Sequence, residues 1–178
     1  VTSNNGCVHD TTKVLSTIFA QPDANFNAPA EVCLTDSAAF TDQSVAANST
    51  VTQWFWDFGD ATTSNLQNPK KRWSAPGTYT VTLYIKSGAG CNSDTLTKEV
   101  IVNPLPGANF NHSAPSCASQ TITFTDASAA NAGTLVKWTW NFGDATPLVV
   151  NTNGNPFTHT FANAGTYNVT LEVETSKG

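Results

Sequence analysis

The sequence predicts an all-β protein made of two β-sandwiches in tandem, preceded by one further strand. Three observations predict this: a long internal repeat, apolar residues that alternate with polar ones, and turn residues between the alternating segments. Apolar residues at every second position are typical of strands with one buried face. Short strands separated by Gly, Pro, Asn and Asp are typical of a sandwich. No segment combines a helical period with capping residues.

The repeat is clearest around two tryptophan-rich segments. Residues 54–60 (WFWDFGD) recur as residues 138–144 (WTWNFGD), 84 residues later. Residues 77–83 (GTYTVTL) recur as residues 165–171 (GTYNVTL), 88 residues later, so the second copy carries four extra residues between the two segments. A repeat of this length indicates that each copy is one structural module.

The alternation within these segments predicts the core of each module. Residues at every second position of a strand point to the same side, so the aromatic and aliphatic residues of each segment share one face. Burial of such side chains contributes roughly 25 cal/mol per Å² of apolar surface. The predicted core residues are Trp54, Trp56, Phe58, Tyr79, Val81 and Leu83 in the first copy, and Trp138, Trp140, Phe142, Tyr167, Val169 and Leu171 in the second.

The ends of the chain are out of phase with the repeat. Gly6-Cys7 lies 84 residues before Gly90-Cys91, which precedes the last strand of the first module. We therefore expect residues 1–20 to be the last strand of a preceding module, residues 21–104 to form the first complete module, and residues 105–178 to form a second that lacks its final strand. A strand needs backbone partners. Residues 1–20 are thus expected to complete a neighbouring module or another copy of the chain by strand addition.

Composition argues against several classes of partner. The chain has eight Lys and Arg and thirteen Asp and Glu, which gives a net charge of −5. It therefore lacks the basic surface by which proteins bind nucleic acid. No apolar stretch reaches the ~20 residues of a membrane span. Residues 1–10 lack the features of a signal peptide, so an export signal would lie outside this sequence.

The sequence also lacks the patterns of common catalytic and metal sites. Its three histidines are scattered, no G-x-S-x-G elbow or phosphate loop is present, and the four cysteines form no CxxC pair. We therefore expect no enzyme activity and no cofactor. One metal alternative stays open, because the carboxylates of Asp57 and Asp60, in a turn with Gly59, could hold Ca²⁺. The competing interpretation is that these carboxylates bond to backbone amides of their own turn.

Taken in order, these segments resemble the PKD (polycystic kidney disease) domain. The resemblance rests on W-x-W-D-F-G-D, then Asn-Pro, then an aromatic residue, then G-T-Y-T-V-T-L, and both copies follow that order. Four positions depart from the family pattern. Ala61 and Ala145 stand where glycine is usual, Lys71 stands where His159 keeps the usual histidine, and Asn141 replaces the aspartate.

The resemblance implies an Ig-like β-sandwich of an extracellular protein. The version with these cysteines resembles modules of large secreted and cell-surface proteins of Bacteroidota. The function it implies is a structural or adhesive repeat: a stalk, filament or adhesin spacer. The alternative is an accessory carbohydrate-binding or spacer module of a secreted hydrolase, for which Phe55 is the candidate exposed aromatic. Extracellular glycans or surfaces are the partners expected besides neighbouring modules.

Two kinds of covalent change are predicted. Counting one pair per repeat, together with the resemblance, predicts a Cys33–Cys91 disulfide, with partners for Cys7 and Cys117 outside this sequence or in another copy. The alternative is four free thiols. Ser37 and Thr95 lie in Asp-Ser-Ala and Asp-Thr-Leu tripeptides, which resemble the short O-glycosylation motif of Bacteroidota.

Overall fold

The computed structural model describes residues 4–6, 9–14, 17–114 and 117–177. Its regular secondary structure is entirely β, which confirms the predicted class, and no helix in this part of the chain could cross a bilayer. The strands are β1 (Phe26–Asn27), β2 (Glu31–Cys33), β3 (Ala38–Ala39), β4 (Thr41–Asp42), β5 (Val51–Asp57), β6 (Thr63–Ser64), β7 (Lys70–Lys71), β8 (Gly77–Ser87), β9 (Leu96–Asn103), β10 (Phe110–His112), β11 (Thr121–Asp126), β12 (Leu135–Asn141), β13 (Val149–Asn151), β14 (Phe157–Thr160) and β15 (Thr170–Thr175).

Module 1 is a two-layer sandwich. Its main sheet has the strand order β2-β9-β8-β5-β6, and the short pairs β1-β4 and β3-β7 contribute to the other layer. All pairs are antiparallel except β2–β9, in which Cys33 lies opposite Asn103 in a parallel ladder. The alternation of β8 sets its orientation, because Val81, Leu83 and Ile85 are completely buried while the intervening side chains are not.

Module 2 repeats this plan with fewer strands. It contains the sheets β13-β12-β15 and β10-β11-β14. The ladder of β12 shifts register between Leu135 and Lys137, and the ladder of β5 shifts between Val51 and Gln53, 84 residues earlier. The sequence repeat is therefore a structural repeat down to the position of one irregularity.

Each module has its own aromatic core. Trp56 and Phe58 stack at 6.5 Å between ring centroids, and Trp140 and Phe142 stack at 6.4 Å. The Trp56 indole N–H donates to the Leu66 carbonyl at 2.8 Å, so its polar atom is satisfied inside the core. All twelve predicted core residues lie in these two clusters or pack against them.

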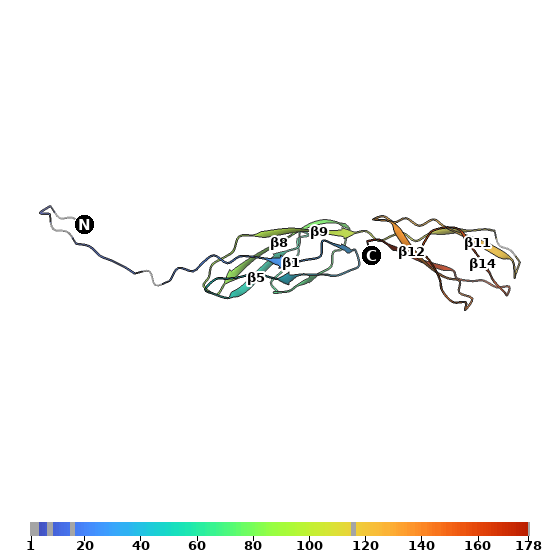
Figure 1. The fold of residues 1–178 in the computed structure, drawn as a ribbon, viewed down its shortest axis with the longest axis horizontal. Coiled ribbons are helices and arrows are strands. Elements are labelled where there is room, and N and C mark those ends of the chain that lie inside the picture. The colour runs from blue at the N-terminus through green and yellow to red at the C-terminus, as the bar shows by residue number, and fades with distance from the viewer. Residues whose placement is uncertain (1–3, 7–8, 15–16, 115–116, 178) are drawn as a thin grey trace.

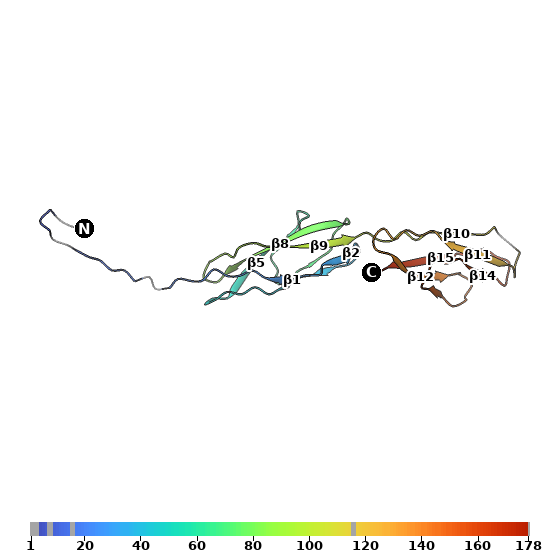
Figure 2. The same ribbon diagram turned by 45° about the horizontal axis from the view of Figure 1, so that its top comes forward.

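The two modules lie end to end (Figure 1). The end of β9 leads directly into module 2, and the C-terminus of the chain returns to the same junction (Figure 2). Ahead of module 1, the described residues between 9 and 20 form no strand, and Val14 and Ile18 expose 89% and 81% of their surface. That segment extends away from the sandwich, and its predicted pairing with another module stays a prediction.

Candidate functional site: turns, module junction and an open sandwich edge

Each module carries the same tight turn after its central strand. The Asp57 carboxylate accepts a hydrogen bond from the Gly59 N–H at 2.9 Å, and the Asn141 side-chain oxygen accepts one from the Gly143 N–H at 3.0 Å. Both glycines have positive φ, and a Cβ on either would lie 2.7 Å from a backbone oxygen. Asp and Asn can exchange at this position because the turn uses one side-chain oxygen as an acceptor.

The next carboxylate of module 1 ties its turn to β7. Asp60 Oδ1 accepts hydrogen bonds from the Thr62 N–H at 3.2 Å and the Thr62 hydroxyl at 2.5 Å. Its Oδ2 lies 2.6 Å from Lys71 Nζ. Burial alone would raise the pKa of Asp60, but the hydrogen bonds from Lys71 and Thr62 lower it overall.

Module 2 makes the same connection with a different partner. Asp144 Oδ1 accepts from the Thr146 N–H and hydroxyl, and Oδ2 lies 2.7 Å from His159 Nε2. The Thr146 hydroxyl, and then His159, hold the pKa of Asp144 at about 2, well below its usual value. Lys71 and His159 are therefore alternative partners for one turn carboxylate.

These contacts show how the candidate calcium ligands are used. Asp57 and Asp60 each accept hydrogen bonds within their own turn. Across the described residues, no three His, Cys, Asp or Glu side chains come together as a metal-binding group would require. Calcium binding at Asp57, Gly59 and Asp60 stays a prediction.

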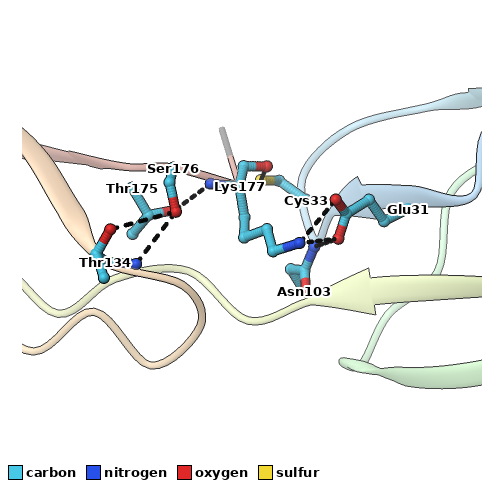
Figure 3. A network of polar contacts seen from close by, with 7 residues as sticks. All are labelled: Glu31, Cys33, Asn103, Thr134, Thr175, Ser176 and Lys177. Carbon is cyan, nitrogen blue, oxygen red and sulfur yellow. Dashed lines mark hydrogen bonds and ion pairs between the residues drawn. The ribbon is translucent and has the colours of Figure 1, made fainter.

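The module junction is held by direct polar contacts. Lys177, after the last strand of module 2, places Nζ 2.9 Å from both carboxylate oxygens of Glu31 in module 1 (Figure 3). The hydrogen bond from Lys177, followed by the one from Asn103, lowers the pKa of Glu31. The Cys33 thiol also donates to the Lys177 carbonyl oxygen, with an Sγ–O distance of 3.3 Å.

The linker adds a second constraint at the junction. It is the short run Asn103-Pro104-Leu105-Pro106, in which each proline restricts its own φ. Asn103 is only 7% exposed, and the Leu105 carbonyl accepts a hydrogen bond from Asn131 Nδ2 at 2.8 Å. The two modules are thus connected by both a stiff linker and contacts beside it.

Module 2 has a hollow of about 820 Å³ along one side of its sandwich. Phe110, Phe124, Phe161, Tyr167 and Val169 are among the residues that line it. In module 1, the corresponding side of β8 pairs with β9, which lies opposite residues 77–83. In the described part of module 2, β15 pairs only with β12.

The side chains of β9 explain why module 1 is filled there. Val100 pairs with Tyr79, the counterpart of Tyr167, and Val100 and Val102 are 0% and 2% exposed. Both belong to the core cluster of module 1. The hollow in module 2 therefore lies where β9 lies in module 1, and aromatic and aliphatic side chains are among those that line it.

Comparison with known families gives the same organisation. The family model described as PKD domain matches residues 19–102 and again residues 103–178. The chain belongs to the PKD domain family. The two matched segments are the two sandwiches described above, so each of them is a PKD module.

Two curated relatives contain segments that are similar to this chain. The chain is 35% identical over 78 residues to collagenase ColA of Bacillus cereus, covering 43% of this chain and 8% of that protein. It is 27% identical over 135 residues to pre-pro-metalloprotease PrtV of Vibrio cholerae, covering 74% of this chain and 14% of that protein. The chain thus spans only a small part of either relative's length.

A solved structure resembles one module. The PKD1 domain of the Vibrio cholerae metalloprotease PrtV is 26% identical to this chain, and the match covers 47% of this chain and 98% of that domain, with a TM-score of 0.43.

The predicted disulfide within PKD module 1 is wrong. Cys33 and Cys91 are both free thiols. Cys33 lies opposite Asn103 at the end of β9, whereas Cys91 lies in the hairpin before β9 begins. Eight strand residues span about 25 Å, far more than the Cα separation of about 4.4–6.8 Å that a disulfide allows.

The other two predicted cysteine sites lie elsewhere. Cys117 is exposed and lines the hollow of module 2. Cys7 lies outside the described residues. Burial, with smaller contributions from Asp36 and Glu31, raises the pKa of the Cys33 thiol, so Cys33 is mainly protonated at neutral pH.

The remaining predicted sites lie at the surface, although Phe55 is partly buried and not fully exposed as predicted. Phe55 stacks on Tyr84 with ring centroids 4.5 Å apart on the outer face of module 1. The corresponding pair in module 2 is Thr139 and Glu172, so the aromatic pair is specific to one module. Ser37 and Thr95 are both exposed, and their glycosylation stays a prediction.

Proposed function

We propose that this chain is a non-catalytic spacer segment of a large secreted or cell-surface protein, in which PKD modules in series form a stalk, a filament or part of an adhesin. The contact between Lys177 and Glu31 carries the proposal, because a spacer must resist bending at its junctions. The Pro-containing linker acts in the same direction. The curated relatives support an accessory role, since their names are those of proteases and the matched segments are 8% and 14% of their lengths.

Small-angle X-ray scattering of the full chain tests this proposal. The expected result is the profile of an elongated two-body particle that keeps one orientation between modules. The Lys177→Glu variant is the matched control, because it places like charges beside Glu31 without altering either core. A parent chain whose modules reorient as freely as those of Lys177→Glu would contradict a stiff spacer.

We infer that the partner of the open edge in module 2 is the 9–20 segment of a second copy of the chain. Val14 and Ile18 of that segment are exposed apolar side chains, and the hollow is lined by aromatic rings. The repeat register makes this segment the counterpart of the β9 region. A bound strand would pair its backbone with residues 165–171, which correspond to the residues 77–83 of β8 that pair with β9.

Sedimentation velocity tests the strand addition. Head-to-tail association should appear as a concentration-dependent increase in sedimentation coefficient. The double variant Val14→Asp, Ile18→Asp should stay monomeric, because it would place two charges in an apolar site. A parent chain that remains monomeric at hundreds of micromolar would refute this partner, and association that survives in the double variant would assign it to another surface.

A carbohydrate-binding role is the alternative, and the Phe55–Tyr84 pair favours it. Aromatic rings on a sheet surface can stack against sugar rings, and Tyr84 is 38% exposed. Pull-down with insoluble polysaccharides, comparing the parent with Phe55→Thr, tests this function. Threonine is the residue that module 2 carries at the same position. Retention of the parent but not of the variant would support glycan binding over a purely structural role.

A further inference from the structure

The junction brings a buried thiol of module 1 against the turn that follows β15 in module 2. Cys33 is 7% exposed, and its Sγ lies 3.3 Å from the carbonyl oxygen of Lys177 (Figure 3). The sequence separation is 144 residues, so only the stacking of one module on the next creates this contact. The neighbour of Cys33 is therefore set by the adjoining module.

The turn that Cys33 meets corresponds to the turn of the β8–β9 hairpin in module 1. The Ser176 N–H donates to the Thr134 carbonyl at 2.8 Å, and the Gly88 N–H donates to the Thr50 carbonyl at 2.8 Å. These pairs are equivalent under the repeat, so Lys177 corresponds to Ala89. In module 1, Cys91 follows Ala89 by two residues.

The two cysteine positions therefore lie at opposite ends of a module. The Cys33 position faces the module that follows, and the Cys91 hairpin lies at the end that faces the module before. When modules stack as they do here, the Cys33 position of one module lies next to the Cys91-equivalent turn of the following module. A hairpin cysteine two residues beyond Lys177 would lie within about 7.6 Å of the Lys177 Cα, because consecutive Cα atoms are about 3.8 Å apart.

We propose that consecutive modules of this type are joined by a disulfide between the Cys33 position of one module and the Gly-Cys hairpin cysteine of the next. The inference deepens the proposed spacer function and rests on the same junction. It pairs Cys91 with the module before and Cys117 with the module after. It also explains why module 1 carries two cysteines, Cys33 and Cys91, that cannot reach each other.

The bond forms by oxidation of two thiols. The two cysteines lose two protons and two electrons as their sulfurs join, and a small disulfide such as oxidised glutathione accepts both and becomes two thiols. The hairpin thiolate attacks the small disulfide first and forms a mixed disulfide. Cys33, held beside the hairpin, then displaces the second small thiol.

A C-terminal extension of the full chain tests the pairing. The extension repeats residues 91–104 after Gly178, and Cys7→Ser, Cys91→Ser and Cys117→Ser leave Cys33 and the added cysteine as the only thiols. After oxidation with a glutathione buffer, the expected results are loss of both titratable thiols and one cross-linked peptide containing Cys33. The matched control carries serine as the first residue of the extension and should keep one titratable thiol.

Folding must be separated from pairing in this experiment. Equal tryptophan fluorescence and equal thermal unfolding of the reduced cysteine and serine forms show that both have folded. A folded, oxidised chain that keeps both thiols, or that cross-links only between molecules, overturns the disulfide. If scattering still shows a stiff particle in that case, the spacer function stands and only the disulfide fails.

Discussion

At the scale of single residues, the two modules show which side-chain properties the fold requires. Asp57 and Asn141 both accept a hydrogen bond from a turn N–H, so the turn requires an oxygen and not a charge. Lys71 and His159 both approach the second turn carboxylate, so that position requires a donor. Comparing equivalent positions of the two modules therefore shows which side-chain property each position requires.

The carboxylate of Asp144 gives a prediction about pH. Its pKa of about 2 in the folded protein lies below the value of about 3.9 expected in the unfolded chain. Its contribution to stability is therefore fully present above pH ~4 and is lost as the pH falls towards 2. In Asp144→Asn, module 2 should be less stable at pH 7 and should lose less stability between pH 4 and 2.

Thermal unfolding followed by tryptophan fluorescence from pH 2 to 7 measures this effect. Asp57→Asn is the control, because Asn141 already fills the same position in the other module. It should change stability at pH 7 by no more than about 0.5 kcal/mol. If the stability of Asp144→Asn and of the parent decreased equally as the pH falls, the prediction that the Asp144 carboxylate stabilises module 2 would be wrong.

Trp56 gives a prediction about the core. Its side chain is 1% exposed and contacts Phe26, Phe40 and Phe58. Trp56→Ala should lower the free energy of unfolding of module 1 by about 3–5 kcal/mol, through lost burial and the cavity that remains. Urea denaturation measures the loss. Leu66→Ala is the control, because the Leu66 side chain is 67% exposed while its carbonyl still accepts the indole hydrogen bond; equal losses in both variants would contradict a Trp-centred core.

At the scale of strands and turns, the local sequence pattern predicted which faces of the strands are buried. It did not predict which strands pair with each other. The alternation in β5 and β8 identified their buried faces, since period two is a local property. The prediction of a Cys33–Cys91 disulfide was wrong because β2 pairs in parallel with the C-terminal end of β9. No local sequence signal specifies that pairing. The contact between Cys33 and Lys177 was equally hidden, because it depends on how the modules stack.

The residue after each Phe-Gly-Asp segment gives a prediction at this scale. Ala61 and Ala145 adopt φ of 64° and 65°, where the family pattern has glycine. A left-handed conformation costs an L-residue about 1–2 kcal/mol, and the added freedom of glycine in the unfolded chain offsets about 0.4–1 kcal/mol of that. Ala61→Gly should therefore stabilise module 1 by about 0.5–1 kcal/mol.

Differential scanning calorimetry measures the resulting rise in Tm. Ala39→Gly is the control, because Ala39 lies in a strand and is not among the residues with positive φ. That exchange should lower the Tm of module 1. A decrease in both variants would show that Ala61 is not strained.

At the scale of the whole molecule, the chain consists of two cores joined by a small polar junction. Twelve buried residues form the core of module 1, and five form that of module 2 within the described residues. The junction contributes one ion pair, Lys177–Glu31, whose side chains are each 39% exposed. An exposed pair of this kind contributes at most about 1 kcal/mol, so the junction orients the modules without merging their stability.

Unfolding should therefore occur in two transitions, with module 2 first, because its core buries fewer side chains and its sandwich has an open edge. Trp140→Ala should shift only the first transition and Trp56→Ala only the second, since each indole belongs to a separate core. Lys177→Gln should move the first transition by less than about 1 kcal/mol. Calorimetry combined with urea denaturation of the three variants resolves these shifts. A single cooperative transition, displaced equally by both tryptophan variants, would mean that the stability of the two modules is coupled far more strongly than one surface ion pair allows.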